Sequence, residues 1–141
     1  IPVHGVTTLE AVAAAVVHRQ TGTPSNATLV ALETKRADIY VQKFDSRGVA
    51  QSEPLAQLPS AAKGLLTENT CLCGDAASRV FAELSETLRA SVNHLFDIER
   101  PDARDIAEIA ARRMSDPVLA EPLYIHPPAA KIPAAAGRLR P

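Results

Sequence analysis

Residues 28–44 read TLVALETKRADIYVQKF, and this stretch decides the fold. Its apolar runs TLVAL (28–32) and IYVQKF (39–44) are rich in strand-forming residues, and the polar ETKRAD segment between them predicts a bend. We therefore expect an antiparallel hairpin, closed by a DSRG turn at 45–48. A third strand near 49–53 would extend the hairpin into a meander.

The segment before the hairpin predicts a helix. Thr7 and Glu10 have the spacing of a capping box, in which each side chain accepts a hydrogen bond from the other residue's backbone N–H. The apolar residues that follow recur on one helical face: Leu9, Val12, Ala13, Val16 and Val17. Gly22 and Pro24 are expected to end this helix.

Strands and helices alternate less strictly after the hairpin. We expect a short helix from Ser60, a strand at NTCLCG (69–74) and a last strand or extended segment at EPLYIH (121–126). One helix after the NTCLCG strand would carry its apolar face on Val80, Phe81, Leu84 and Leu88. Another would begin at Pro101-Asp102. Its inward residues would be Ala103, Ile106, Ile109, Ala110 and Met114.

This mixture favours an α/β lobe with a mixed, partly antiparallel sheet flanked by helices. A chain of 141 residues suits one domain, and its net charge of −1 gives no overall attraction for nucleic acid or an anionic membrane. No apolar run is long enough for a membrane span. We expect residues 1–126 to fold and the Pro/Ala-rich residues 127–141 to be mobile.

The cysteines and histidines predict no metal or cofactor site. Cys71 and Cys73 are expected to be buried strand residues that face opposite sides, form no mutual disulfide and stay reduced in a cytoplasmic protein. The four histidines are scattered, and none lies three or four residues from another His or from a Cys. We therefore assign no catalytic, metal-binding or cofactor-binding residue.

Two polar turns are the candidate sites. CGDAAS (73–78) places a Gly-Asp turn between a strand and a helix, where backbone N–H groups can hold a phosphate. Asp75 is better explained as the N-cap of that helix, and its charge would oppose a phosphate. The ETKRAD bend and the strand after it supply a candidate polar or interaction site, although a solvated turn is the commoner outcome. Its residues are Glu33, Lys35, Arg36, Asp38 and Tyr40.

Three stretches in this order resemble one family: PVHGVTTLEAVA (2–13), TLVALETKRADIYVQKF (28–44) and AEPLYIHPPAAK (120–131). They resemble the C-terminal part of the bacterial TsaB (YeaZ) family, glycoprotease-like proteins of the actin-like (ASKHA, ribonuclease-H-like) ATPase fold. The resemblance implies that residues 1–126 form the C-terminal lobe of such a protein. The family's N-terminal lobe and its motifs are missing from this sequence, so Ile1 is expected to begin the back half of a longer protein.

The hairpin departs from the family pattern. Relatives commonly read Ile-Asp-Ala-Arg-x-Gly-Glu-Val-Tyr where this chain reads LETKRADIY (32–40). Lys35 lacks the bidentate fork of the family's arginine, and Ala37 lacks the freedom of glycine at positive φ. Ala76 likewise replaces the family's second glycine after the CLC-like strand. We expect altered contacts at the hairpin and weakened nucleotide binding at the turn.

The resemblance implies a role in forming threonylcarbamoyladenosine at position thirty-seven of tRNA. A TsaB-like protein is a non-catalytic scaffold in that pathway: it pairs with the metal-containing catalytic subunit TsaD, and the ATPase TsaE joins them. The pairing surface lies mainly on the N-terminal lobe, a homodimer of the full-length protein is an option, and tRNA would be contacted only indirectly. The alternatives are a glycoprotease-like peptidase or actin-fold phosphotransferase that needs the other lobe for its cleft, and a free-standing binding module.

Overall fold

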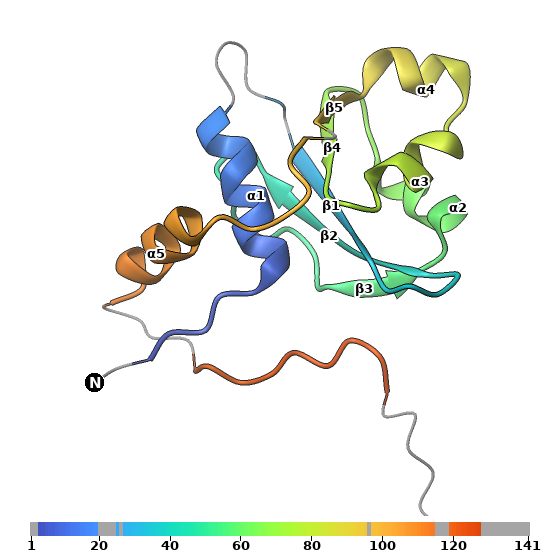
Figure 1. Cartoon of the computed structure of the whole chain (residues 1–141). Helices are drawn as coiled ribbons and strands as arrows, with labels where there is room; N and C mark the ends of the chain where they lie inside the picture. The colour runs from blue at the N-terminus through green and yellow to red at the C-terminus, as the bar shows by residue number, and fades with distance from the viewer. Residues whose placement is uncertain (1–2, 20–24, 26, 96, 115–118, 128–141) are drawn as a thin grey trace, which may run out of the picture.

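The computed structural model describes residues 3–19, 25, 27–95, 97–114 and 119–127. A five-stranded sheet in the order β3-β2-β1-β4-β5 forms its centre (Figure 1). β2 is antiparallel to β1 and β3, whereas β4 runs parallel to both β1 and β5. The strands are β1 (Ala27–Glu33), β2 (Ile39–Asp45), β3 (Leu55–Gln57), β4 (Thr70–Cys73) and β5 (Asn93–Leu95).

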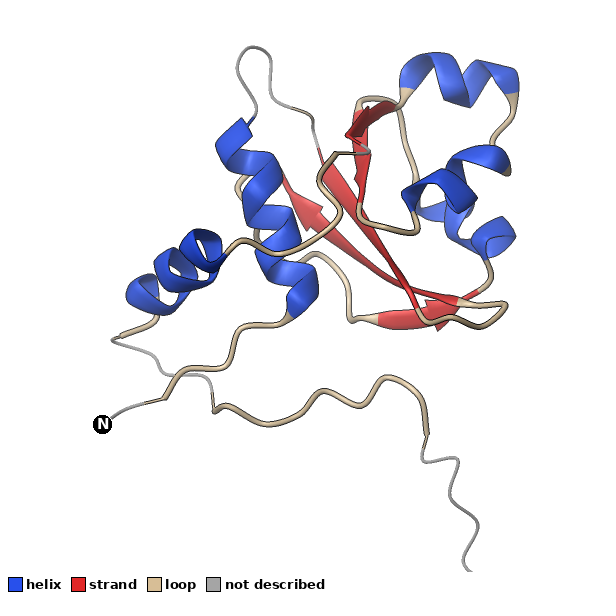
Figure 2. Ribbon diagram, in the orientation of Figure 1, coloured by secondary structure: helices blue, strands red, loops and turns tan. Residues whose placement is uncertain are grey.

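Helices cover both faces of the sheet, which confirms the predicted α/β class (Figure 2). On one face lie α1 (Thr8–Arg19) and, packed against it, α5 (Ala103–Arg112). On the other lie α2 (Pro59–Ala62), the 3-10 helix η1 (Lys63–Leu65), α3 (Ala77–Ala82) and α4 (Glu86–Ser91). Within the part of the chain that the structure describes, no helix is long and apolar enough to cross a membrane.

Successive side chains of each strand point to opposite faces of the sheet, so the sheet has two apolar faces. Leu29 and Leu72 pack toward α3, whereas Val30 and Phe44 pack toward α1. The prediction that Cys71 and Cys73 face opposite sides was wrong, because residues two apart in a strand share a face. Both are free thiols on the α1 side. Burial raises the pKa of the Cys71 thiol to about 11 and that of Cys73 well above its ordinary value, so both stay protonated.

The predicted hairpin is confirmed, with Ala27–Glu33 paired in register to Ile39–Asp45. The bend at 34–38 closes it, whereas the turn at 45–48, which was expected to do so, follows β2 and is held by a hydrogen bond from the Gly48 N–H to the Asp45 carbonyl. The third strand is Leu55–Gln57, not residues 49–53, where the structure has only an isolated bridge between Phe44 and Ala50. The Ser52 hydroxyl accepts from the Lys43 N–H at 3.1 Å, so a side chain occupies that ladder position. Regular pairing therefore begins only after Pro54, which has no N–H to donate.

The capping box at the start of α1 is confirmed. The Thr7 N–H donates to the Glu10 carboxylate at 2.9 Å, and the Glu10 N–H donates to the Thr7 hydroxyl at 3.1 Å. The buried face is broader than predicted, because Ala11 and Ala15 are buried as well. The expected stop signals at 22–24 and most of the predicted tail, residues 128–141, lie outside the described residues.

The helix predicted around Val80–Leu88 is two helices, α3 and α4. Residues 83–85 separate them, and the Ser85 hydroxyl caps α4 by accepting from the Leu88 N–H at 3.4 Å. The predicted apolar residues nevertheless reach one core: Val80 and Leu84 are buried in it, and Phe81 and Leu88 pack against it. The short helix expected from Ser60 is present as α2.

Two predictions near the end of the chain are confirmed only in part. α5 begins at Ala103 with Asp102 as its N-cap, as expected, but its buried residue is Asp105. Of the residues predicted to face inward, Ile109 and Ala110 are half-buried, whereas Ile106 is 39% and Met114 73% exposed. The cause is an ion pair between Asp105 and His18 of α1, which turns that face of α5 inward. Residues 121–126 join no strand and run as an irregular segment outside the sheet (Figure 1).

The turn after β4 lies directly against the backbone of β1. Gly74 has φ +99°, and a Cβ there would lie 2.1 Å from the carbonyl oxygen of Ala31 on β1. That oxygen accepts from the Ala76 N–H at 3.1 Å, and the Gly74 N–H donates to the Ile98 carbonyl at 2.9 Å. Because only glycine fits this conformation and this gap, the turn can lie directly on the end of β1.

We predict that Gly74→Ala lowers the free energy of unfolding by about 3 kcal/mol, because it adds backbone strain and a clash with a strand carbonyl. Gly64→Ala is the matched control, since a Cβ there meets nothing within 4 Å. That variant should leave stability unchanged or raise it by up to about 1 kcal/mol. Urea unfolding followed by circular dichroism measures both, and equal midpoints would contradict the account.

Candidate functional site

The tip of the β1–β2 hairpin is fastened to α3 by Arg79, a residue that the sequence did not single out. Its Nη1 donates to both carboxylate oxygens of Glu33 at 2.9 and 3.0 Å. Its Nη2 donates to the carbonyl oxygens of Ala37 at 2.6 Å and Arg36 at 3.3 Å. Glu33, a predicted site residue, therefore holds the hairpin in place.

Asp75 supports the same strand end. The prediction that it caps the following helix was wrong, because α3 begins at Ala77 with Ala76 as N-cap and without a side-chain cap. The Asp75 carboxylate instead accepts from the Glu33 N–H at 2.8 Å. The N–H groups of Gly74 and Ala76 both donate to carbonyl oxygens, so they are not directed at a phosphate.

Asp38 and Tyr40, both predicted site residues, meet at His126. The Asp38 carboxylate lies 2.5 Å from Nε2 of His126, and the Tyr40 hydroxyl lies 2.8 Å from its Nδ1. The ring centroids of Tyr40 and His126 are 5.1 Å apart, and the two ring planes are tilted by 52°. The hydrogen bond from His126, with another from Thr34, holds the pKa of Asp38 below its ordinary value.

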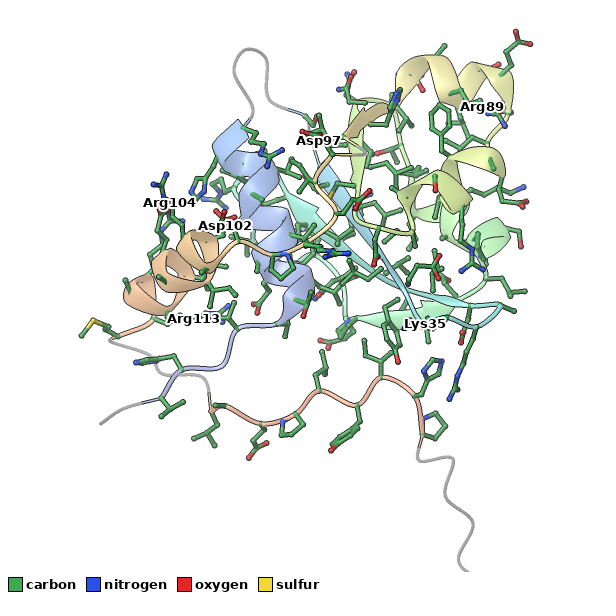
Figure 3. All side chains as sticks on the ribbon, viewed as in Figure 1. Lys35, Arg89, Asp97, Asp102, Arg104 and Arg113 are labelled. Atoms are coloured by element: carbon green, nitrogen blue, oxygen red, sulfur yellow. The ribbon has the colours of Figure 1, made fainter. Side chains whose placement is uncertain are left out.

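The side chains of Lys35 and Arg36 stay outside these networks. Both are exposed, and Lys35 adopts φ 60°, so the left-handed residue of the bend is Lys35 and not Ala37. Figure 3 shows Lys35 at the outer end of the hairpin. Of the five predicted residues, the structure thus ties Glu33 to Arg79 and joins Asp38 to Tyr40 through His126. The remaining two are left for solvent or a partner.

A groove of about 1080 Å³ lies beside the hairpin, at the carboxyl ends of β1, β4 and β5. This edge is where open α/β sheets usually place their ligands. Its walls combine residues 4–10, the end of β1, Asp75 just after β4, residues 99–101, and residues 119–123 with Ile125. Tyr40 belongs to the wall, so its hydroxyl connects the groove with His126.

Several polar residues of the groove are paired within the protein, whereas the buried Nδ1 of His4 has no hydrogen-bond partner among the described residues. Arg113 forms an ion pair with Glu10, and its Nη1 donates to the Gly5 carbonyl at 2.9 Å, which ties the end of α5 to the first segment (Figure 3). Burial raises the pKa of Glu10, but the hydrogen bonds from Arg113 and Thr7 outweigh it and lower the pKa overall. No group of three or more His, Cys, Asp or Glu among the described residues is placed to hold a metal ion.

The comparison with known proteins supports the fold. No protein-family profile and no curated protein matches the chain. One similar solved structure is an uncharacterized protein with similarity to peptidase YeaZ, from Pseudomonas aeruginosa, with a TM-score of 0.64 and 16% identity. The fold is YeaZ-like. The alignment covers 89% of this chain but only 59% of the neighbour, and at this identity the likeness concerns the fold alone.

The sequence did not indicate Arg79 and His126, because each acts on a residue far away in the chain. Arg79 acts on Glu33 across 46 positions, and His126 acts on Asp38 across 88 positions. No local spacing signals such pairs. The signal that was present is the resemblance, because His126 lies in the third family-like stretch and Asp38 in the second.

We predict that Arg79→Met lowers the free energy of unfolding by about 1 kcal/mol. The variant loses two hydrogen bonds to carbonyl oxygens and an ion pair whose two side chains are each about one third exposed. Hydrogen exchange of residues 34–38 should speed up in the same variant. Arg104→Met, on the exposed side of α5, is the control and should change neither quantity. Unchanged hydrogen exchange at the hairpin tip in Arg79→Met would refute the claim that Arg79 fastens the tip to α3.

The His126–Asp38 bond predicts a pH dependence. The native pKa of Asp38 is lowered, so its stabilising contribution is complete above its ordinary pKa of about 3.9 and disappears as pH falls through the native value. Carboxyl-carbon NMR should give Asp38 a titration midpoint below 3.9 in the wild type and closer to it in His126→Ala. Tyr124→Ala, whose residue is 81% exposed, should keep the wild-type midpoint. The same midpoint in His126→Ala as in the wild type would contradict the contact.

Proposed function

We propose that this chain is the C-terminal lobe of a TsaB-like subunit, a non-catalytic scaffold in the formation of threonylcarbamoyladenosine at position thirty-seven of tRNA. The observation that carries the proposal is that the family-like stretches, far apart in sequence, converge on one groove. Residues 4–10, the end of β1 with Tyr40, and residues 119–123 with Ile125 all form its walls. Together with the YeaZ-like fold, this supports a shared architecture and not a chance likeness of short motifs.

The contacts between these stretches are tight. A Cβ on Gly5 would lie 3.3 Å from the Ala120 Cα, and 2.5 Å from the carbonyl oxygen of the preceding Leu119, so the first and third stretches touch at backbone level. His126 joins the third stretch to Asp38 and Tyr40 of the second. We propose that the assembled groove is the face that meets the rest of a two-lobed protein, since the chain spans 59% of its structural neighbour.

The pairing of three carboxylates in the groove supports a scaffold over an enzyme. A nucleophile or general base must direct a free lone pair at the substrate. In this groove Glu10 is engaged by Arg113, Glu33 by Arg79, and Asp75 by a backbone N–H. Such pairs fix the shape of a surface. The proposed partners are a TsaD-like catalytic subunit and a TsaE-like ATPase in the cytoplasm, with tRNA contacted through them.

A peptidase is the second candidate, because the neighbour's own description mentions a peptidase. The observation in its favour is the array of the Tyr40 hydroxyl, the His126 imidazole and the Asp38 carboxylate, the group types of a hydrolytic triad. Tyr40→Phe in the full-length protein separates the candidates. Loss of peptide hydrolysis in that variant would favour the peptidase, whereas intact support of tRNA modification would favour the scaffold.

We predict that the full-length protein co-purifies with its TsaD-like partner and restores the modified nucleoside in a depleted strain. Residues 1–141 alone should bind that partner weakly or not at all, because the proposed pairing surface lies mainly on the other lobe. Calorimetry on both proteins and mass spectrometry of tRNA nucleosides measure these outcomes. Failure of the full-length protein in both assays would refute the scaffold, and a tight complex with residues 1–141 would refute the placement of the pairing surface.

A further inference from the structure

α5 is attached to the rest of the lobe mainly by polar contacts. Within this helix, all of whose residues are described, only Asp105 is buried. Of its apolar residues, Ile109 and Ala110 are half-buried and Ile106 is 39% exposed. Two polar contacts hold its ends. Near its start, Asp105 meets His18 of α1, and just after its end, Arg113 meets Glu10. A helix with so little buried apolar surface depends on the charge state of these groups.

His18 stands between two carboxylates of α5. Its Nδ1 lies 2.7 Å from Asp105 Oδ1, and its Nε2 lies 3.0 Å from Glu108 Oε2. The Asp105 side chain is 7% exposed, so its charge is removed from water. A neutral imidazole has one N–H and directs a lone pair at one of the two carboxylates, whereas an imidazolium donates to both. The geometry therefore fits the protonated ring.

The other charged groups near His18 do not replace it as the partner of Asp105. Arg112 approaches Glu108 at 3.6 Å, and Arg47 lines the same small cavity as His18. Arg113 and Glu10 also line that cavity but are paired with each other. On α1, the helix that carries His18, the Nη1 atom of Arg19 lies 2.7 Å from Oδ2 of Asp97. Arg112 therefore shares Glu108 with His18, whereas the partner of the buried Asp105 among the described residues is His18.

We propose that His18 is a protonation-dependent latch that docks the first turns of α5 on α1 and thereby sets the shape of the groove. α5 lies in the chain between two groove walls, residues 99–101 and residues 119–123 with Ile125. When the imidazole loses its proton, the start of α5 loosens while Arg113 still holds its end. The wall at 99–101, directly before α5, then shifts with it. The latch is independent of the proposed scaffold function.

NMR on the chain of 141 residues tests the latch between pH 5 and 8.5, the range in which imidazoles titrate. Ring-nitrogen spectra report the His18 charge, and hydrogen exchange, corrected for intrinsic rate, reports the opening of α5. We expect the protection of α5 amides against exchange to fall about fivefold as His18 deprotonates. A change of this size corresponds to the loss of two ion pairs that are exposed in part. Signals of residues 99–101 should shift with the same midpoint.

His18→Gln should abolish the pH dependence of α5 protection. Asp105→Asn should reduce it, because one of the two carboxylates that the ring contacts is then neutral. His94→Gln is the matched control, because His94 lies on β5 against the Phe81 ring, and it should keep the wild-type profile. The latch is refuted if α5 protection is independent of pH in the wild type, or equally dependent in His18→Gln. The coupling to the groove is refuted if signals of residues 99–101 do not follow His18.

Discussion

The contact between the Gly74 turn and the end of β1 is the constraint on which the rest of the structure depends. β1 pairs with β4 only as far as Val30 and Cys73, although its pairing with β2 continues to Glu33. Beyond that point the turn takes over the free side of β1, through the Ala31 carbonyl and the Asp75 carboxylate. One glycine at φ +99° thus lets a turn replace a strand without leaving a buried backbone group unpaired.

This replacement determines what lies at the carboxyl edge of the sheet. It starts α3 where Arg79 reaches Glu33 and the hairpin carbonyls, so the hairpin tip is rigid. The edge beside it then forms the groove, and the segment that ends in His126 closes one side by binding Asp38. The site is therefore a consequence of backbone packing first and of side-chain pairing second. Its paired charges suit a surface that another lobe or protein recognises.

The sequence was informative where the cause of structure is local. The hairpin, the capping box at Thr7 and the strand at 70–73 each have their signals within a few residues, and all three were correctly predicted. The inward face of α5 was predicted only in part, because a histidine 87 positions away pairs with Asp105 and overrides the apolar pattern. Asp75 was misassigned for the same reason, since its partner is the Glu33 N–H, 42 positions away. Family resemblance located the groove stretches but not these pairs.

The central claim is that the turn at 74–76 is hydrogen-bonded to the end of β1. NMR couplings through hydrogen bonds measure this directly, because they connect a donor nitrogen with its acceptor carbonyl carbon. The account predicts couplings from Ala76 nitrogen to the Ala31 carbonyl and from Gly74 nitrogen to the Ile98 carbonyl. If the couplings between β1 and β4 were present and these two were absent, the turn would not lie on β1 and the account of the groove would be contradicted.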